Sequence, residues 1–469
     1  MSPSTTVIVS SIAADDEDDY NSYIKPLGRR SVIYYGMGHM LNDITAACWF
    51  TYLLVFLSDI GLSPRAAASI MLSGQISDGF ATVFSGELID RFGHFKIWHA
   101  AGSVFVAVLF SSVFGGCLPC KIFGTSSVLV ETRSYCVIAV VFNLGWAATQ
   151  VSHMSMVNCM TLNSTSRVVL TSCRNAFTMV ANLGLYAIAF VVFSATNGNT
   201  QADVETQYRW IAYISIFIGA GFVGMFQFGT KEPRLKIGLG GNNDARISWT
   251  YWFKKVLYYQ VAVVYMLTRL VQNVSQAYLA FYVIDELGMA NSAKALVPAI
   301  IYICSFIVSI ILQELAWTGK RLKAYYSVGG ILWIICGAAV IILPRSMGAF
   351  MYVIAVVMGI ATALIMVTGI SMQNVLIGED LNGCAFVTGS LCFLDKMSCG
   401  IVVYILQSYQ SSSSSSELPD KDTGNPYLSI TRIGLGLVPA ICSLVGVAIT
   451  YTMKLDTSYS KALVEPLLV

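Results

Sequence analysis

Long apolar segments, separated by short polar breaks, run along the chain from Ser31 to Met453. Each has roughly 20 residues or more, enough to cross about 30 Å of hydrocarbon as a helix whose backbone hydrogen bonds are all internal. The pattern therefore predicts an all-α membrane protein. Twelve transmembrane helices are expected, at residues 31–57, 66–89, 97–116, 135–159, 168–194, 210–229, 256–284, 295–315, 324–343, 350–376, 384–408 and 428–453.

Composition agrees with this pattern, since 56% hydrophobic residues and a mean hydropathy of +0.67 exceed what an ordinary soluble globule can bury. The first thirty residues lack the charged start and short apolar run of a signal peptide, so the first helix is expected to direct insertion. With the amino terminus in the cytosol, most loop Lys and Arg residues also lie there, as the positive-inside rule requires. The net charge of +2 gives no reason to expect a nucleic-acid partner.

A polar, basic segment at 230–255 divides the helices six and six. The two halves resemble each other: "YLLVFLSD" at 52–59 matches "YLAFYVID" at 278–285, an offset of about 226 residues. The same offset makes the position of Asp43 equivalent to that of Arg269. Two pseudo-symmetric halves predict a substrate site between them near the membrane midplane. The expected parts are an acidic cytosolic tail (1–30), a first half (31–229), a linker (230–255), a second half (256–453) and a cytosolic tail (454–469).

Charged residues inside the predicted helices are the main candidates for function, because an ionisable group at bilayer depth is costly unless it is paired or lines a wet cavity. The five are Asp43, Asp78, Arg174, Arg269 and Lys396. Structural ion pairs between helices are the alternative. Three bases against two acids predict a cavity with surplus positive charge, suited to an anion or awaiting a proton or cation. Asp78 and Lys396 are expected to pair if their helices face each other, and His39 shares a helical face with Asp43.

A charged loop follows the second helix, with Gly86, Asp90, Arg91, Gly93 and Lys96 at the spacing G-x-x-x-D-R-x-G-x-x-K. This spacing resembles the signature loop of the major facilitator superfamily. The resemblance implies the fold of that superfamily and a cytosolic latch, in which these charges hold neighbouring helix ends in one state of the transport cycle. An ordinary solvated loop is the alternative.

The stretch from "YGMGHMLND" through "GQISDGF" is similar to the melibiose-carrier branch of that superfamily. The resemblance implies a sugar site at Asp43 and Arg174, and a cation site at Asp78 and Lys396. That branch has a second carboxylate four residues after the first, where this chain has Thr82. Losing an anionic ligand weakens a sodium site, so proton coupling or no coupling is favoured over sodium.

A closer resemblance is carried by "GHMLND", "FNLGWAATQVSHMS", "MLTRLVQNVSQAYLA" and "GSLCFLDKMSCG", which are similar to the family called major facilitator superfamily domain-containing protein 12. It implies secondary transport of cysteine, or a related small thiol or amino acid, into lysosomes or melanosomes; the plasma membrane is the alternative location. The implied substrate residues are Asp43, Arg174, Arg269 and Lys396. The coupling residues we predict are Asp78, Lys396, His39 and His153.

Other features leave few further functions open. Cys117 and Cys120 form a C-x-x-C at the non-cytosolic end of the third helix, for which redox activity, metal binding and a purely structural role are all open. No P-loop or Ser/His/Asp set is recognisable, so we expect no enzyme activity, no cofactor and no metal. The expected partners are the lipid bilayer, a small-molecule substrate and protons, without an obligate protein partner. A sugar or lysolipid symporter and a non-transporting receptor or scaffold are the alternative functions.

Overall fold

The fold comes from a computed structural model that describes residues 26–92, 94–117, 120, 122, 124, 127–161, 164–196, 200–232, 249–313, 319–377, 384–415 and 429–455. Within these ranges the chain is helical apart from short connections, and no strand occurs. Most of the predicted tails and of the linker lie outside the described residues, so their boundaries stay predictions.

The first half contains six membrane-crossing segments, the first of which is interrupted at Gly38 and His39. They are α2 (Arg29–Met37) with α3 (Met40–Asp59), α4 (Pro64–Phe92), α5 (Phe95–Phe114), α7 (Val128–Met160), α8 (Ser164–Ala195) and α9 (Gln201–Gly229). Helices α7 and α9 begin earlier than the predicted 135 and 210, because each starts with a segment that contains charged residues, such as Glu131 in α7 and Asp203 in α9, before its main apolar run. In α9 a capping box between Thr200 and Asp203 marks this early start.

The second half repeats this arrangement after the short helix α10 (Trp249–Phe253). Its segments are α11 (Val256–Phe281) continued by η1 (Tyr282–Glu286), α12 (Ala293–Gln313), α13 (Gly319–Ile342), α14 (Phe350–Ile377), α15 (Cys384–Ser415), and α16 (Ile430–Arg432) continued by η4 (Ile433–Leu437) and α17 (Val438–Thr452). A single turn, η2 (Arg345–Met347), connects α13 and α14. The twelve predicted helices are therefore all present.

Ten of these segments are apolar enough, by composition alone, to be recognised as membrane spans within the described residues. The other two, α4 and α11, are long enough at 29 and 26 residues but carry buried polar side chains such as Asp78 and Asn273. A helix that turns polar groups inward and packs against other helices can be less apolar and still cross the bilayer. These two helices are therefore the first places to look for a site.

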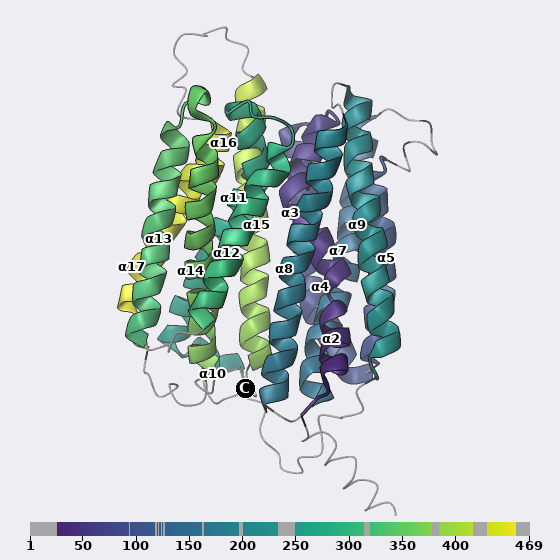
Figure 1. The fold of residues 1–469 in the computed structure, drawn as a ribbon, viewed down its shortest axis with the longest axis vertical. Helices are drawn as coiled ribbons and strands as arrows, with labels where there is room; N and C mark the ends of the chain where they lie inside the picture. The colour runs from purple at the N-terminus through teal and green to yellow at the C-terminus, as the bar shows by residue number, and fades with distance from the viewer. Residues whose placement is uncertain are drawn as a thin grey trace, which may run out of the picture.

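Figure 1 shows the two halves side by side, with α2 to α9 on one side and α11 to α17 on the other. The outer faces carry exposed apolar side chains such as Phe217 and Phe228, as lipid contact requires. Helices pack closely where glycines face each other. A Cβ on Gly102 of α5 would lie 2.7 Å from the carbonyl oxygen of Gly145 in α7, so only glycine permits this approach.

Candidate functional site

One narrow line of residues on α3 remains partly exposed although the rest of that helix is buried. From Leu41 to Leu57 it consists of Asp43, Ala46 and Phe50, spaced i, i+3 and i+7. Residues with this spacing share one face of a helix. Asp43 therefore lies on the face of α3 that lines the space left between the helices.

Helix α11 has a corresponding line, formed by Tyr265, Met266, Arg269 and Gln272 between buried neighbours. Arg269 occupies the position equivalent to Asp43 under the 226-residue offset predicted above. The two symmetry-related helices thus present an acid and a base toward the interior at equivalent positions.

Asp43 is held by two neighbours of different character. Its Oδ2 atom accepts a hydrogen bond of 2.6 Å from the Thr178 hydroxyl of α8, and its Oδ1 atom lies 3.6 Å from Nε2 of His39. The side chain is 12% exposed, whereas His39 is 1% exposed. Thr178 and His39 therefore orient the carboxylate of Asp43, which keeps one accessible side.

Arg174 lies one helical turn before Thr178 on α8, close enough for its charge to act on Asp43. Within the described part of the chain its Nε atom is buried and has no hydrogen-bond partner, and it takes part in no ion pair. A buried donor without an acceptor is costly, so this guanidinium is ready to receive an anion.

Asp78 and Lys396 form the ion pair that the sequence predicted, between α4 of one half and α15 of the other. Thr82, which stands where relatives of the melibiose-carrier type have a carboxylate, touches both: its Oγ1 lies 3.2 Å from the Lys396 Nζ and 3.3 Å from Asp78 Oδ1. The ammonium also lies 4.8 Å from the ring centroid of Trp146. The pair is thus enclosed, with a hydroxyl in the position of the missing ligand.

Arg269 pairs with a residue that the sequence analysis overlooked. Its Nε donates to Oδ2 of Asp395 at 3.0 Å, and the Asn273 amide donates to the other carboxylate oxygen at 3.1 Å. Asp395 adds a third acid to the five predicted charges, so acids and bases are equal in number within that set and its predicted surplus of positive charge is wrong. Of these six residues, Arg174 alone has no ion-pair partner among the described residues, and its Nε atom is buried without an acceptor. The sequence signal for Asp395 was its position directly before Lys396 in "FLDKM".

Three of the chain's four histidines pack together at the interrupted start of α3. Ring centroids of His39 and His153 are 5.2 Å apart, and those of His99 and His153 are 5.7 Å apart. His99 Nε2 lies 2.9 Å from the Gly38 carbonyl oxygen, and His153 Nε2 lies 2.8 Å from that of Tyr35. Because a carbonyl only accepts, both Nε2 atoms carry a hydrogen.

The opposite ring nitrogens distinguish these histidines. His99 Nδ1 accepts from the Gln227 amide at 3.0 Å, so both of its nitrogens are engaged. His39 Nδ1 and His153 Nδ1 are buried without a partner among the described residues. His39 and His153 therefore each keep one ring nitrogen without a hydrogen-bond partner in the described part of the chain, whereas both nitrogens of His99 are engaged.

A small recess beside the ion pair is walled mainly by aromatic rings. Its cavity volume is about 10 Å³, room for about one water molecule. Trp49 and Phe142 stack with centroids 4.6 Å apart in its wall. The full lining is Ala46, Trp49, Phe50, Asp78, Phe142, Asn143 and Trp146. Ala46 and Phe50 belong to the same line on α3 as Asp43, so the recess adjoins that carboxylate.

Contacts between the halves close the interior on the side that the sequence predicts to be non-cytosolic. The Gln276 amide of α11 donates to Thr51 of α3 at 2.8 Å, and the Thr51 hydroxyl lies 3.1 Å from that of Tyr186. The ring of Tyr186 also packs on that of Tyr302 in α12, with centroids 5.4 Å apart. Since Thr51 follows Asp43 by two helical turns, this layer lies just beyond the charged site.

Lys294 at the start of α12 forms a second layer of closure. Its Nζ lies 3.7 Å from Asp59 Oδ2 and 3.3 Å from the Tyr208 hydroxyl, both in the first half. Tyr52 also donates to the Lys294 carbonyl oxygen at 3.2 Å. The structure therefore represents a state in which the two halves meet on this side.

The predicted latch is described only in part. The side chains of Asp90 and Arg91, and Gly93 as a whole, lie outside the described residues. Lys96 donates from Nζ to the Thr230 carbonyl oxygen at 2.6 Å, and from its backbone to Glu232 at 3.1 Å. Gly86 has no close neighbour that would exclude a side chain. Lys96 thus ties α5 to the end of α9, and the latch stays a prediction.

Comparison with known proteins assigns the chain to a family. The sequence matches the family described as MFS/sugar transport protein over residues 34–457. It is 32% identical over 415 residues to the human major facilitator superfamily domain-containing protein 12, covering 82% of this chain and 86% of the human one. It is also 25% identical over 206 residues to the glucuronide carrier protein homolog of Escherichia coli, 43% of this chain and 42% of that protein.

Solved structures with little sequence identity show the same fold. A partially occluded, inward-open xylose transporter from E. coli superposes with a TM-score of 0.66 at 10% identity, covering 91% of this chain and 99% of that one. The shared fold is that of the major facilitator superfamily, with twelve helices in two halves.

Proposed function

The chain belongs to the major facilitator superfamily domain-containing protein 12 family, a group of membrane transporters, and we propose that it carries a small zwitterionic amino acid by alternating access. Cysteine is the first candidate, because the motifs that carry the family resemblance imply it. The proposed destination is the lumen of lysosomes or related organelles, with the plasma membrane as the alternative.

The observation that carries this proposal is the unsatisfied Arg174 next to the oriented Asp43. Arg174 would bind the carboxylate of the solute, because its buried Nε lacks an acceptor within the described residues. Asp43 would bind the ammonium group on its accessible side, while Thr178 holds the other carboxylate oxygen at 2.6 Å. A zwitterion satisfies both groups at once, which a neutral sugar does not.

Arg269 and Lys396 would enter the binding site in other states of the cycle, since here each is engaged by a carboxylate. A proton that neutralises Asp78 would release Lys396 from the ion pair between the halves. His39 and His153, each with an unpartnered Nδ1, would take up and pass on the proton near Asp43. Asp78, Lys396, His39 and His153 form our proposed coupling apparatus.

A sugar carrier is the second candidate, supported by the matched family description and by the similarity to the glucuronide carrier homolog. A hexuronide carries a carboxylate that Arg174 would also bind, but it offers no ammonium for Asp43. A non-transporting receptor or scaffold is the third candidate, and it predicts that no solute accumulates at all.

Uptake of labelled cysteine into vesicles that contain the purified full-length protein tests the proposal. We expect saturable uptake that is reduced about 10- to 100-fold by Arg174→Ala, since a charge-assisted hydrogen bond contributes about 1.5–3 kcal/mol. Arg133→Ala removes an exposed arginine of α7 and serves as the matched control. Glucuronate uptake with the same dependence on Arg174, but without cysteine uptake, would favour the sugar carrier. Uptake of neither solute by the folded protein would support the scaffold.

A further inference from the structure

A disulfide at the non-cytosolic end of α5 has features that favour a chemical role over a structural one. Cys117 and Cys120 are bonded to each other across a separation of three residues. The position follows from the end of α5, where Gly116 has a positive φ of 92° that turns the chain out of the helix. The pair therefore lies in the connection that follows α5, far along the chain from the charged site.

A disulfide this short contributes little as a staple. In the chain-entropy account, a crosslink stabilises a protein less as the loop that it closes becomes shorter. Metal binding is also disfavoured, because both thiols are consumed in the bond and the described residues include no group of three metal-ligating side chains. A redox role, one of the roles left open by the sequence, remains to be considered.

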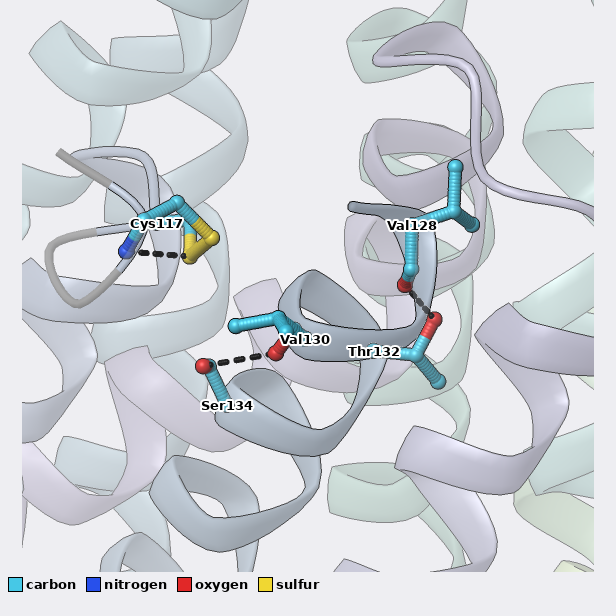
Figure 2. Close-up of a disulfide and its surroundings, with 6 residues drawn as sticks. Cys117, Val128, Val130, Thr132 and Ser134 are labelled. Carbon is cyan, nitrogen blue, oxygen red and sulfur yellow. Dashed lines mark hydrogen bonds between the residues drawn. A yellow bond between two sulfur atoms is a disulfide. The ribbon is translucent and has the colours of Figure 1, made fainter. Parts of the chain in front are cut away.

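The two sulfurs differ in surroundings. Cys117 is 7% exposed and packs into the core, whereas Cys120 is partly exposed. The backbone N–H of Cys120 donates to the Cys117 sulfur at 3.1 Å (Figure 2). The hydroxyls of Thr132 and Ser134 drawn in the same view donate to carbonyl oxygens of their own helix, α7. Cys120 is thus the more exposed partner, and the Cys117 sulfur has a donor that stabilises a leaving thiolate.

We propose that Cys117–Cys120 is a thiol–disulfide exchange site for low-molecular-weight thiols at the non-cytosolic face. A small thiolate attacks the Cys120 sulfur, a new S–S bond forms, and the electron pair of the broken bond goes to the Cys117 sulfur. A second thiolate then attacks the sulfur of the bound small thiol and displaces Cys120. Two small thiols are thereby oxidised to one small disulfide. The protein disulfide receives their two protons and two electrons and is reduced to two thiols.

This inference does not depend on which solute the protein carries. If cysteine is carried, the transported solute is itself a suitable thiol. Reduction of the pair would then respond to cysteine that accumulates at the non-cytosolic face. If another solute is carried, the pair would respond to other small thiols at that face.

The test titrates the full-length protein in membranes with cysteine and cystine at defined ratios, followed by acid quenching and mass spectrometry of the peptide containing Cys117 and Cys120. We expect the pair to pass from disulfide to dithiol across the titration while the protein stays folded. A pair that stays oxidised at every ratio until the protein is denatured would overturn the proposal, and so would a pair that is never oxidised.

Single serine variants test the direction of attack. In Cys117→Ser the partly exposed Cys120 should form a mixed disulfide with cystine, at least about tenfold faster than the buried Cys117 does in Cys120→Ser. Equal rates would contradict the proposed asymmetry. If either variant fails to fold, the wild-type titration still decides whether the pair exchanges.

Discussion

Removing one partner of the Asp78–Lys396 ion pair should destabilise the protein more than removing both. The side chains are only 4% and 10% exposed, so neither charge left alone can be solvated in place. It would have to lose its charge, which at pH 7 costs about 4 kcal/mol for a carboxylate and about 5 kcal/mol for an ammonium of ordinary pKa. These limits agree with the roughly 3–5 kcal/mol found when buried pairs are broken.

The remaining contacts separate the two single variants. In Asp78→Asn, Lys396 keeps the Thr82 hydroxyl at 3.2 Å and the Trp146 ring at 4.8 Å, so we expect a loss near the lower limit. In Lys396→Met, Asp78 keeps only the weaker contact with Thr82 at 3.3 Å among the side-chain hydrogen bonds described, so we expect the larger loss. The double variant should lie within about 1 kcal/mol of the wild type, because no buried charge is left unpaired.

Unfolding of the purified protein in detergent between pH 5 and pH 8 measures these losses. In Lys396→Met the folded state holds a proton on Asp78 that the unfolded state releases above about pH 4, so the loss should shrink by up to about 1.4 kcal/mol per unit toward acid. In Asp78→Asn the folded state lacks a proton that the unfolded state binds, so the loss should shrink toward alkaline pH. Additive losses in the double variant, or losses independent of pH, would refute this reasoning.

Three other predictions follow from the described contacts. Asp395→Asn should destabilise the protein by about 2–3 kcal/mol in detergent unfolding, because Arg269 loses its ionised partner; an unchanged midpoint would contradict this. Lys294→Gln should loosen the non-cytosolic closure and increase labelling of an engineered Thr51→Cys from that side by a membrane-impermeant thiol reagent; unchanged labelling would show that other contacts hold the halves together. Gly102→Ala should lower stability by about 1–3 kcal/mol, whereas Gly184→Ala, with open space around it, should not.

The sequence predicted the helices well because the bilayer imposes a length and an apolar composition that few other structures share. Their ends were less accurate: α7 and α9 begin with segments in which charged residues such as Glu131 and Asp203 interrupt the apolar signal. The pairing of Asp78 with Lys396 was expected, but only the packing of α4 against α15 brings them together. Asp395 was missed because hydropathy cannot tell whether one or both of two adjacent charges face the interior. The layer at Tyr186 and Tyr302 consists of residues common in any buried helix, so no pattern singled it out.

Asp395 and Lys396 also explain how one helix serves two different tasks. Adjacent residues on an α-helix point about 100° apart, so the two charges of α15 address different neighbours. Asp395 pairs with Arg269 of α11, which belongs to the same half, whereas Lys396 pairs with Asp78 of the other half. When two halves rock against each other as rigid bodies, contacts within a half persist and contacts between halves must change. The Arg269–Asp395 pair is therefore suited to preserve the second half through the cycle. The Asp78–Lys396 pair is the one whose making and breaking a bound solute or proton can control.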